Sequence, residues 1–118
     1  MSVEVLYSKI HRAQVTDANL NYQGSITIGK SLAQAAKLHP WMKVDVLNVN
    51  NGARFTTYVI VSEEEGTICV NGAASRLVQV GDVVIIVAYS LMDLEQVSKH
   101  EPFIVFVGDN NQIKENDV

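Results

Sequence analysis

Short apolar runs, several of them alternating with polar residues, recur along the chain. They occupy residues 43–49, 54–61, 67–70, 82–89 and 103–107, and residues typical of turns separate them. Such runs are typical of strands. The pattern predicts a mainly β protein with few helices, either a closed barrel or a sandwich, because closure removes exposed sheet edges. Alternation by itself does not choose between these two architectures.

The sequence between the first two runs predicts a hairpin. Asn51-Gly52 suits the two positive-φ positions of a type I′ turn. A two-residue loop there places Arg54 and Tyr58 on one side of the hairpin and Thr57 on the other, because side chains alternate along a strand. The predicted cross-strand pairs are Val49–Arg54, Leu47–Thr56 and Asp45–Tyr58.

Two helices are predicted. In residues 31–40, Ser31 can cap the helix and Pro40 restricts its continuation. A second short helix is expected from Asp93, whose side chain could cap it while Gln96 reaches back. The polar C-terminal segment, residues 108–118, is expected to fray.

Composition argues against several classes of function. The 118 residues suffice for one domain with a substantial core, and the formal net charge is −4. The nine lysines and arginines are dispersed, so no nucleic-acid surface is predicted. Cys69 is the only cysteine, which excludes an internal disulfide. The histidines, His11, His39 and His100, lack the spacing of metal ligands, so we expect no metal site.

No segment predicts membrane insertion or export. The longest apolar run, residues 83–89, is shorter than a helix that spans a bilayer. The N-terminal residues lack the basic start and apolar core of a signal peptide. We therefore expect a cytoplasmic protein whose partners are small molecules or further subunits.

The dipeptide Gly24-Ser25 permits two interpretations. It is typical of a tight turn ahead of the short strand that follows it. Alternatively, the Ser25 hydroxyl attacks the Gly24 carbonyl carbon and converts the amide into an ester, and glycine favours this reaction because it leaves the carbonyl accessible. Elimination of the ester and hydrolysis of the resulting imine would split the chain, release ammonia and leave a pyruvoyl group.

Four segments together resemble the family of pyruvoyl-dependent aspartate 1-decarboxylases. They cover most of residues 1–90 in the order and near the spacing of that family. The segments are KIHRAQVTDANLNYQGS (9–25), NNGARFTTYVI (50–60), VNGAAS (70–75) and VGDVVII (80–86). The combination is specific, although no single segment would be.

The resemblance implies a fold and a maturation reaction. The expected fold is a double-psi β-barrel with a few short helices, assembled as a homotetramer with active sites between subunits. The single domain, residues 1–118, would cleave itself between Gly24 and Ser25. Residues 1–24 would become the β chain, and residues 25–118 the α chain, which begins with the pyruvoyl cofactor derived from Ser25.

The resemblance also implies an activity, the decarboxylation of L-aspartate to β-alanine and CO2 for pantothenate and coenzyme A biosynthesis. Ser25 would supply the group that forms a Schiff base with the substrate. Tyr58 would be the proton donor, and Thr57 would assist cleavage. Residues that match substrate-binding positions of the family are Lys9, Arg54, Thr57, Asn71, Gly72, Ala73 and Ala74.

The residues themselves leave other interpretations open. Arg54 can grip a carboxylate with its planar guanidinium, but arginine is also a common surface residue. Tyr58 can be a packing residue, Thr57 a residue chosen for strand propensity, and Lys9 a surface charge. Because alternation separates Thr57 from Arg54 and Tyr58, we expect a bulge or an end of regular pairing near residues 56–58.

Three residues depart from the pattern associated with the family. Asn21 and Gln23 stand where some relatives carry histidine and glutamate, which bears on the rate of cleavage. Leu47 stands where a tryptophan can occur, and it could form an apolar pocket wall. Two alternative functions remain, a pyruvoyl enzyme for another amino acid and an uncleaved barrel that acts as a binding or assembly module.

Overall fold

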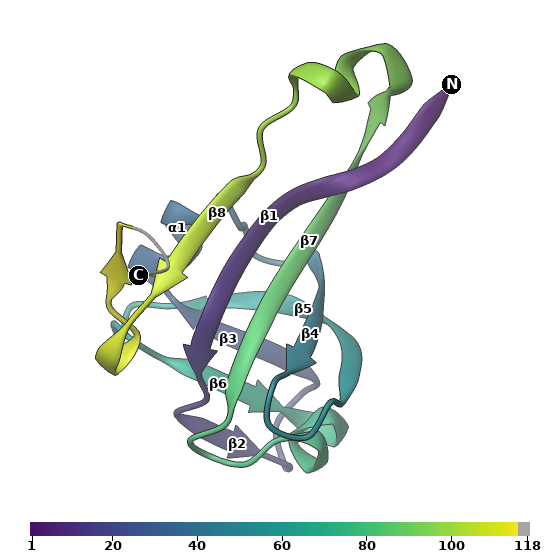
Figure 1. The fold of residues 1–118 in the computed structure, drawn as a ribbon. Coiled ribbons are helices and arrows are strands. Elements are labelled where there is room, and N and C mark those ends of the chain that lie inside the picture. The colour runs from purple at the N-terminus through teal and green to yellow at the C-terminus, as the bar shows by residue number, and fades with distance from the viewer. Residues whose placement is uncertain (116–118) are drawn as a thin grey trace.

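The computed structural model describes residues 1–115 and is built mainly from strands (Figure 1). This confirms the mainly β class. The strands are β1 (Ser2–Gln14), β2 (Asp17–Asn19), β3 (Ser25–Gly29), β4 (Lys43–Asn48), β5 (Arg54–Ser62), β6 (Ile68–Asn71), β7 (Val83–Asp93), β8 (Phe103–Val107) and β9 (Ile113–Lys114). The helices are α1 (Lys30–Ala35) and the 3-10 helices η1 (Gly72–Leu77), η2 (Leu94–Lys99) and η3 (Asp109–Asn111).

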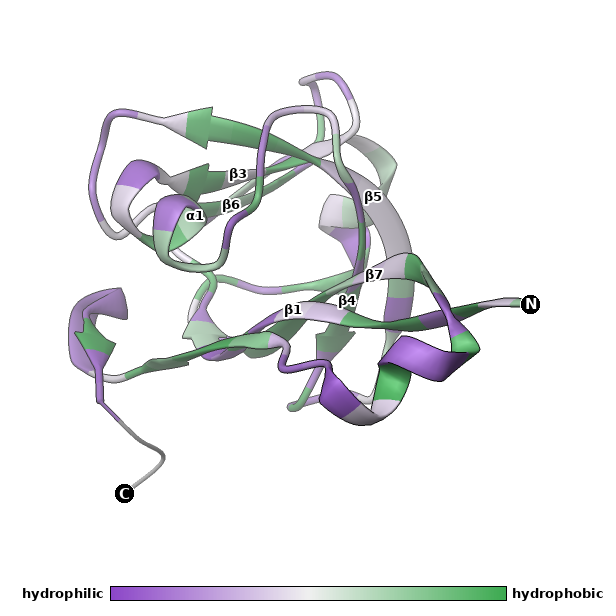
Figure 2. Ribbon diagram, turned by 90° about the horizontal axis from the view of Figure 1, so that it is seen from above, coloured by the Kyte–Doolittle hydropathy of each residue, from purple (hydrophilic) through white to green (hydrophobic). Residues whose placement is uncertain are grey.

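The strands form one sheet in the order β2-β6-β3-β5-β4-β7-β1-β8-β9. Three neighbouring pairs run parallel, namely β1 with β8, β2 with β6 and β3 with β5, and the others run antiparallel. Figure 2 shows β3, β6 and α1 on one side of the molecule and β1, β4 and β7 on the other. Both sides contribute fully buried residues to a single core, among them Ile26, Ile10 and Val46. This arrangement is consistent with a double-psi β-barrel.

The long first strand, β1, has no counterpart in the predicted strands. Its pairing with β7 is interrupted between Leu6 and Ser8 and again between Ile10 and Ala13. Arg12, inside the second irregularity, has φ of +71°. Each irregularity changes which residues face the core, so the strand lacks a continuous alternation that sequence reading could detect.

The predicted hairpin exists, but its predicted register is wrong by two residues. The observed pairs run from Leu47–Arg54 to Lys43–Tyr58. The main-chain N–H of Asn48 donates to the main-chain carbonyl of Ala53, at 2.8 Å. This bond closes a loop that is longer than two residues. Of the predicted turn pair only Gly52 has positive φ, +76°, so the turn is not type I′. A shift of two residues leaves every side chain on its predicted face.

Both helix caps differ from prediction. The N-cap of α1 is Gly29, not Ser31, because the chain passes directly from β3 into the helix. The helix ends at Ala35, before Lys37 adopts φ of +56°, rather than continuing to Pro40. Helix η2 does follow Asp93, but as a 3-10 helix without a side-chain cap.

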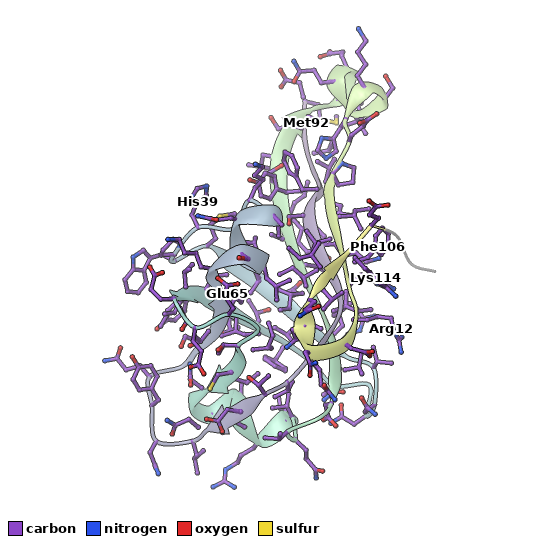
Figure 3. The ribbon with its side chains drawn as sticks, turned by 90° about the vertical axis from the view of Figure 1, so that its left-hand side faces the viewer. Arg12, His39, Glu65, Met92, Phe106 and Lys114 are labelled. Carbon is purple, nitrogen blue, oxygen red and sulfur yellow. The ribbon has the colours of Figure 1, made fainter. Side chains whose placement is uncertain are left out.

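The expectation of a frayed C-terminus is wrong for residues 108–114. Asn111 is buried, with 4% of its surface exposed, and its side chain bonds to Gln14 of β1 and to the Gly66 carbonyl. Strand β9 then pairs with β8, and Lys114 lies opposite Phe106 (Figure 3). Residues 116–118, which also belong to that prediction, lie outside the described residues.

Candidate active site

Ser25 is the first residue of β3 and is completely buried. Its hydroxyl donates a hydrogen bond to the Gln23 carbonyl, at 3.1 Å, and accepts one from Asn71 Nδ2, at 2.9 Å. The bond to Asn71 crosses from β3 to the end of β6, where Ser25 and Asn71 are register partners. The hydroxyl next to the Gly24-Ser25 bond is therefore held between two protein groups and away from solvent.

The Asn71 side chain is oriented by two further contacts. Its Nδ2 also donates to Thr27 Oγ1, at 3.0 Å, and its Oδ1 accepts from Cys69 Sγ, at 3.2 Å. Burial, and next the negative charge of Asp17, raise the pKa of the Cys69 thiol, so the thiol remains a donor at neutral pH. Because a thiol donor selects the amide oxygen, the nitrogen is turned toward Ser25. The sequence interpretation included Asn71 but missed Cys69 and Thr27, which carry no motif.

Gly72 touches the segment that precedes Ser25. It has φ of +74°, and a Cβ placed on it would lie 2.7 Å from Gly24 Cα and 2.9 Å from Gly24 N. Glycine is thus required both by backbone conformation and by space. The close approach predicted for residues 71–74 is found at Gly72. Ala73 and Ala74 follow in η1, exposed and half-buried respectively.

Tyr58 reaches the same region through the parallel pairing of β3 with β5. This ladder pairs Ile26 with Val59, so Tyr58 stands level with Ser25, one position earlier on each strand. Ile26 and Val59 are fully buried in the core, and both Ser25 and Tyr58 therefore lie on the opposite face. The Tyr58 ring stacks on Trp41, with centroids 5.7 Å apart. Trp41 is outside the predicted site.

Thr57 lies on the core side, as alternation predicted. It pairs with buried Val44 of β4. No bulge interrupts the pairing of β4 with β5 over residues 54–58. The other expectation, an end of regular pairing near residues 56–58, is met. Pairing of β5 with β4 stops at Tyr58, and β5 then pairs with β3. Thr57 and Tyr58 thus lie on opposite faces of β5.

Arg54 is not part of this cluster within one chain. It lies four residues before Tyr58 on β5, a separation of about 13 Å along an extended strand. It borders a hollow of about 140 Å³ together with Leu47 and Asp45. Leu47 therefore does line a wall beside Arg54, but at a distance from Ser25.

Lys9 is also remote from Arg54 within one chain. It pairs with Val87, Val87 pairs with Asp45, and Asp45 pairs with Thr56. Three strand spacings therefore separate Lys9 from Thr56, about 14 Å. A separate hollow of about 510 Å³ beside α1 contains none of the predicted site residues.

Asn21 and Gln23 contact their surroundings through the main chain. The main-chain N–H of Asn21 donates to Asn19 Oδ1, at 3.1 Å, and the main-chain carbonyl of Gln23 accepts from the Ser25 hydroxyl. A different side chain at position 23 leaves that carbonyl in place.

Residues 1–115 contain no group of three or more histidine, cysteine, aspartate or glutamate side chains placed to hold a metal ion. Within that same range no helix is long and apolar enough to cross a membrane.

Comparison with known proteins gives a consistent result. Residues 1–114 match the family model described as aspartate decarboxylase. The chain is 58% identical to aspartate 1-decarboxylase of Helicobacter acinonychis over 115 residues, which cover 98% of this chain and 99% of the relative. It is 62% identical to aspartate 1-decarboxylase of Caldicellulosiruptor saccharolyticus over 114 residues, covering 96% and 89%. The chain therefore belongs to the aspartate decarboxylase family.

Proposed function

We propose that this protein decarboxylates L-aspartate to β-alanine and CO2 and so supplies pantothenate and coenzyme A biosynthesis. Family membership supports the activity and the substrate. The observation that carries the proposal for this chain is that Asn71 and Gly72 contact both sides of one peptide bond, Asn71 at Ser25 and Gly72 at Gly24. The cytoplasmic location expected from the sequence belongs to the same proposal.

The proposed cofactor is a pyruvoyl group derived from Ser25, and the surroundings of Ser25 fit its formation. The Ser25 hydroxyl is buried, and the space around the Gly24 Cα is open on the side where a side chain would stand. A carbonyl group at this position supplies an electron sink for decarboxylation of an amino acid. The role proposed for Thr57 is to stabilise the oxyanion that forms when Ser25 attacks.

Tyr58 is the proposed proton donor. It lies level with Ser25 on the same face of the sheet, and its hydroxyl would deliver a proton to the substrate carbon that has lost CO2. Asn71 Nδ2, once relieved of the Ser25 hydroxyl, becomes a donor for the substrate. Both roles require only groups that already surround Ser25.

Arg54 and Lys9 are the proposed carboxylate ligands, and they imply assembly. Arg54 lies about 13 Å from Tyr58 along β5, and Lys9 lies on β1, three strands away from β5 in the sheet, so we infer that a second copy supplies them. This supports the proposed homotetramer with sites between subunits. Ala73 and Ala74, at the start of η1, would form the small-residue wall on the Asn71 side.

The mass of the purified chains tests the proposal. We expect fragments 1–24 and 25–118, with the second fragment one ammonia lighter than hydrolysis alone would produce. Ser25→Ala should remain one intact, inactive chain, because alanine has no hydroxyl for the attack. A wild-type protein that stays uncleaved and inactive would support the alternative of a binding or assembly module, and an uncleaved active protein would exclude the pyruvoyl group.

A substrate panel tests the specificity. Cleaved enzyme should release CO2 from aspartate and not from glutamate, alanine, histidine or arginine, because a fixed cation is poorly paired without the second carboxylate. Arg54→Lys retains charge but loses the planar fork, so kcat/KM for aspartate should fall about tenfold or more. Preference for a neutral or cationic amino acid would favour a different pyruvoyl enzyme, and unchanged kinetics in the variant would remove Arg54 from the site.

A further inference from the structure

Trp41 is the only tryptophan of the chain and has an unusual conformation. It follows Pro40 in a turn that is closed by a hydrogen bond from the Met42 amide to the His39 carbonyl, at 3.2 Å. Its φ is +77°. Proline followed by a positive-φ residue is the pattern of a type II turn, in which the second of these positions normally holds glycine or asparagine. A large aromatic residue therefore occupies a position suited to glycine.

Two features of Trp41 are unfavourable in an isolated chain. The left-handed backbone brings its Cβ close to the following carbonyl, which strains any residue other than glycine. In addition, 75% of its surface is exposed. The turn projects from the body beyond α1, as the position of His39 shows (Figure 3). Neither backbone geometry nor core packing accounts for tryptophan at this position.

The ring of Trp41 does have one specific partner, which is the ring of Tyr58. The two rings are nearly parallel, with an interplanar angle of 24° and centroids 5.7 Å apart. Main-chain bonds hold the turn against β5 next to Tyr58, from the Trp41 amide to the Val59 carbonyl at 2.9 Å and from the Val59 amide to the Met42 carbonyl at 3.0 Å. The stacked pair is thus anchored on both sides of the aromatic contact.

Tyr58 needs such support because of its place on β5. It is the last residue paired with β4 and immediately precedes the segment paired with β3. Its side chain is half-buried and lies on the face opposite the core, where core packing does not restrict its rotamer. An aromatic plane against one face of its ring restricts both side-chain torsions and therefore the position of the hydroxyl.

We propose that Trp41 is a positioning residue for Tyr58, and that its stacked indole holds the phenol in the orientation needed to protonate the decarboxylated carbon. The inference rests on the proposed function, in which Tyr58 is the proton donor. In this role Trp41 acts through its contact with Tyr58. The proposed role gives a reason for a tryptophan at this strained position.

The proposal separates catalysis from stability in a measurable way. Trp41→Gly removes the stacking partner and also relieves the strained backbone, so the melting temperature should rise by about 2 to 5 °C. At the same time kcat for aspartate should fall about three- to tenfold with KM unchanged, since the contact acts in the chemical step. Trp41→Phe retains an aromatic plane and should restore most of kcat.

Lys37→Gly is the matched control. Lys37 also has positive φ, +56°, and is exposed four residues earlier, but it contacts Phe103 and not Tyr58. This variant should relieve similar strain and leave kcat unchanged. All variants are first checked for complete cleavage by mass and for oligomeric state by size-exclusion chromatography, and wild-type release of CO2 from aspartate tests the proposed function separately.

Several results would overturn the positioning role. An unchanged kcat in Trp41→Gly would do so, as would a Phe variant as impaired as the Gly variant. Dissociation of subunits in proportion to lost activity would instead assign the exposed indole to a contact with another copy of the chain. Loss of kcat with a higher melting temperature, intact assembly and rescue by phenylalanine is the result that supports the proposal.

Discussion

A side chain on Gly72 would collide with the backbone of Gly24, which in the proposed function supplies the carbonyl for cleavage. We predict that Gly72→Ala folds with reduced stability and cleaves at least tenfold more slowly, because the methyl group displaces the Gly24 segment from Ser25. Time-resolved mass measurement of freshly produced protein gives the cleavage rate.

Gly52→Ala provides the control for Gly72→Ala. Gly52 has nearly the same φ, +76°, but a Cβ there meets no atom within 4 Å. Both variants place alanine in the left-handed region, at a cost of about 1 to 2 kcal/mol. Equal cleavage rates in the two variants would show that strain alone, and not contact with Gly24, explains the effect.

At the scale of elements, Asp82 joins the end of β4 to the turn before β7. Its Oδ2 accepts hydrogen bonds from Asn48 Nδ2, at 2.8 Å, and from the Gln79 amide, at 2.9 Å. The bond from Asn48, and next the bond from the Gln79 main chain, lower the pKa of Asp82 below its ordinary value of 3.8. Both bonds favour the ionised carboxylate.

The sign of the resulting pH dependence follows from linkage. A carboxyl group whose pKa is lower in the folded state stabilises the fold above pH 3.8 and loses this contribution as the pH falls through the folded value. We predict that Asp82→Asn is less stable than wild type at neutral pH and that the difference disappears in strong acid. Urea unfolding from pH 7 to pH 2 measures the difference in free energy of unfolding between wild type and Asp82→Asn. A constant difference across this range would contradict the lowered pKa of Asp82.

The register of the hairpin shows why an element can be predicted while its pairing is not. The strands and their faces follow from alternation, and both agree with the structure. The conformation of the loop is fixed by two asparagine side chains. The main-chain N–H of Asn50 donates to Asn48 Oδ1, and the main-chain N–H of Ala53 donates to Asn51 Oδ1. These bonds lengthen the loop by two residues, and alternation cannot detect a shift of two.

At the scale of the whole molecule, Asn111 connects three distant segments. Its side chain accepts from the Gln14 amide, at 2.7 Å, and donates to the Gln14 and Gly66 carbonyls, each at 2.8 Å. The C-terminal segment is thereby fastened to β1 and to the turn between β5 and β6. Because these groups are partly buried, loss of the Asn111 side-chain amide leaves the main-chain N–H and carbonyl of Gln14 and the carbonyl of Gly66 without this partner.

We predict that Asn111→Gly lowers the free energy of unfolding by about 2 to 4 kcal/mol. Glycine is chosen because Asn111 has φ of +56°, so backbone strain does not confuse the result. Asn110→Gly is the control, since Asn110 has φ of +57° but is exposed. Urea unfolding compares the two, and similar stabilities would show that the three bonds are not important for the fold.

Resemblance to a known family indicated the dipeptide at which the chain is proposed to cleave. The sequence by itself determined the class of the fold and the faces of the predicted hairpin. These properties depend on neighbours along the chain, through alternation and backbone preferences. Only the tertiary structure decided that Asn71, 46 residues from Ser25, donates to its hydroxyl, that Gly72 lies against Gly24, and that Trp41 stacks on Tyr58. Such contacts depend on which strands pair and in which register, and a period-two pattern specifies the face of a residue but not its partner.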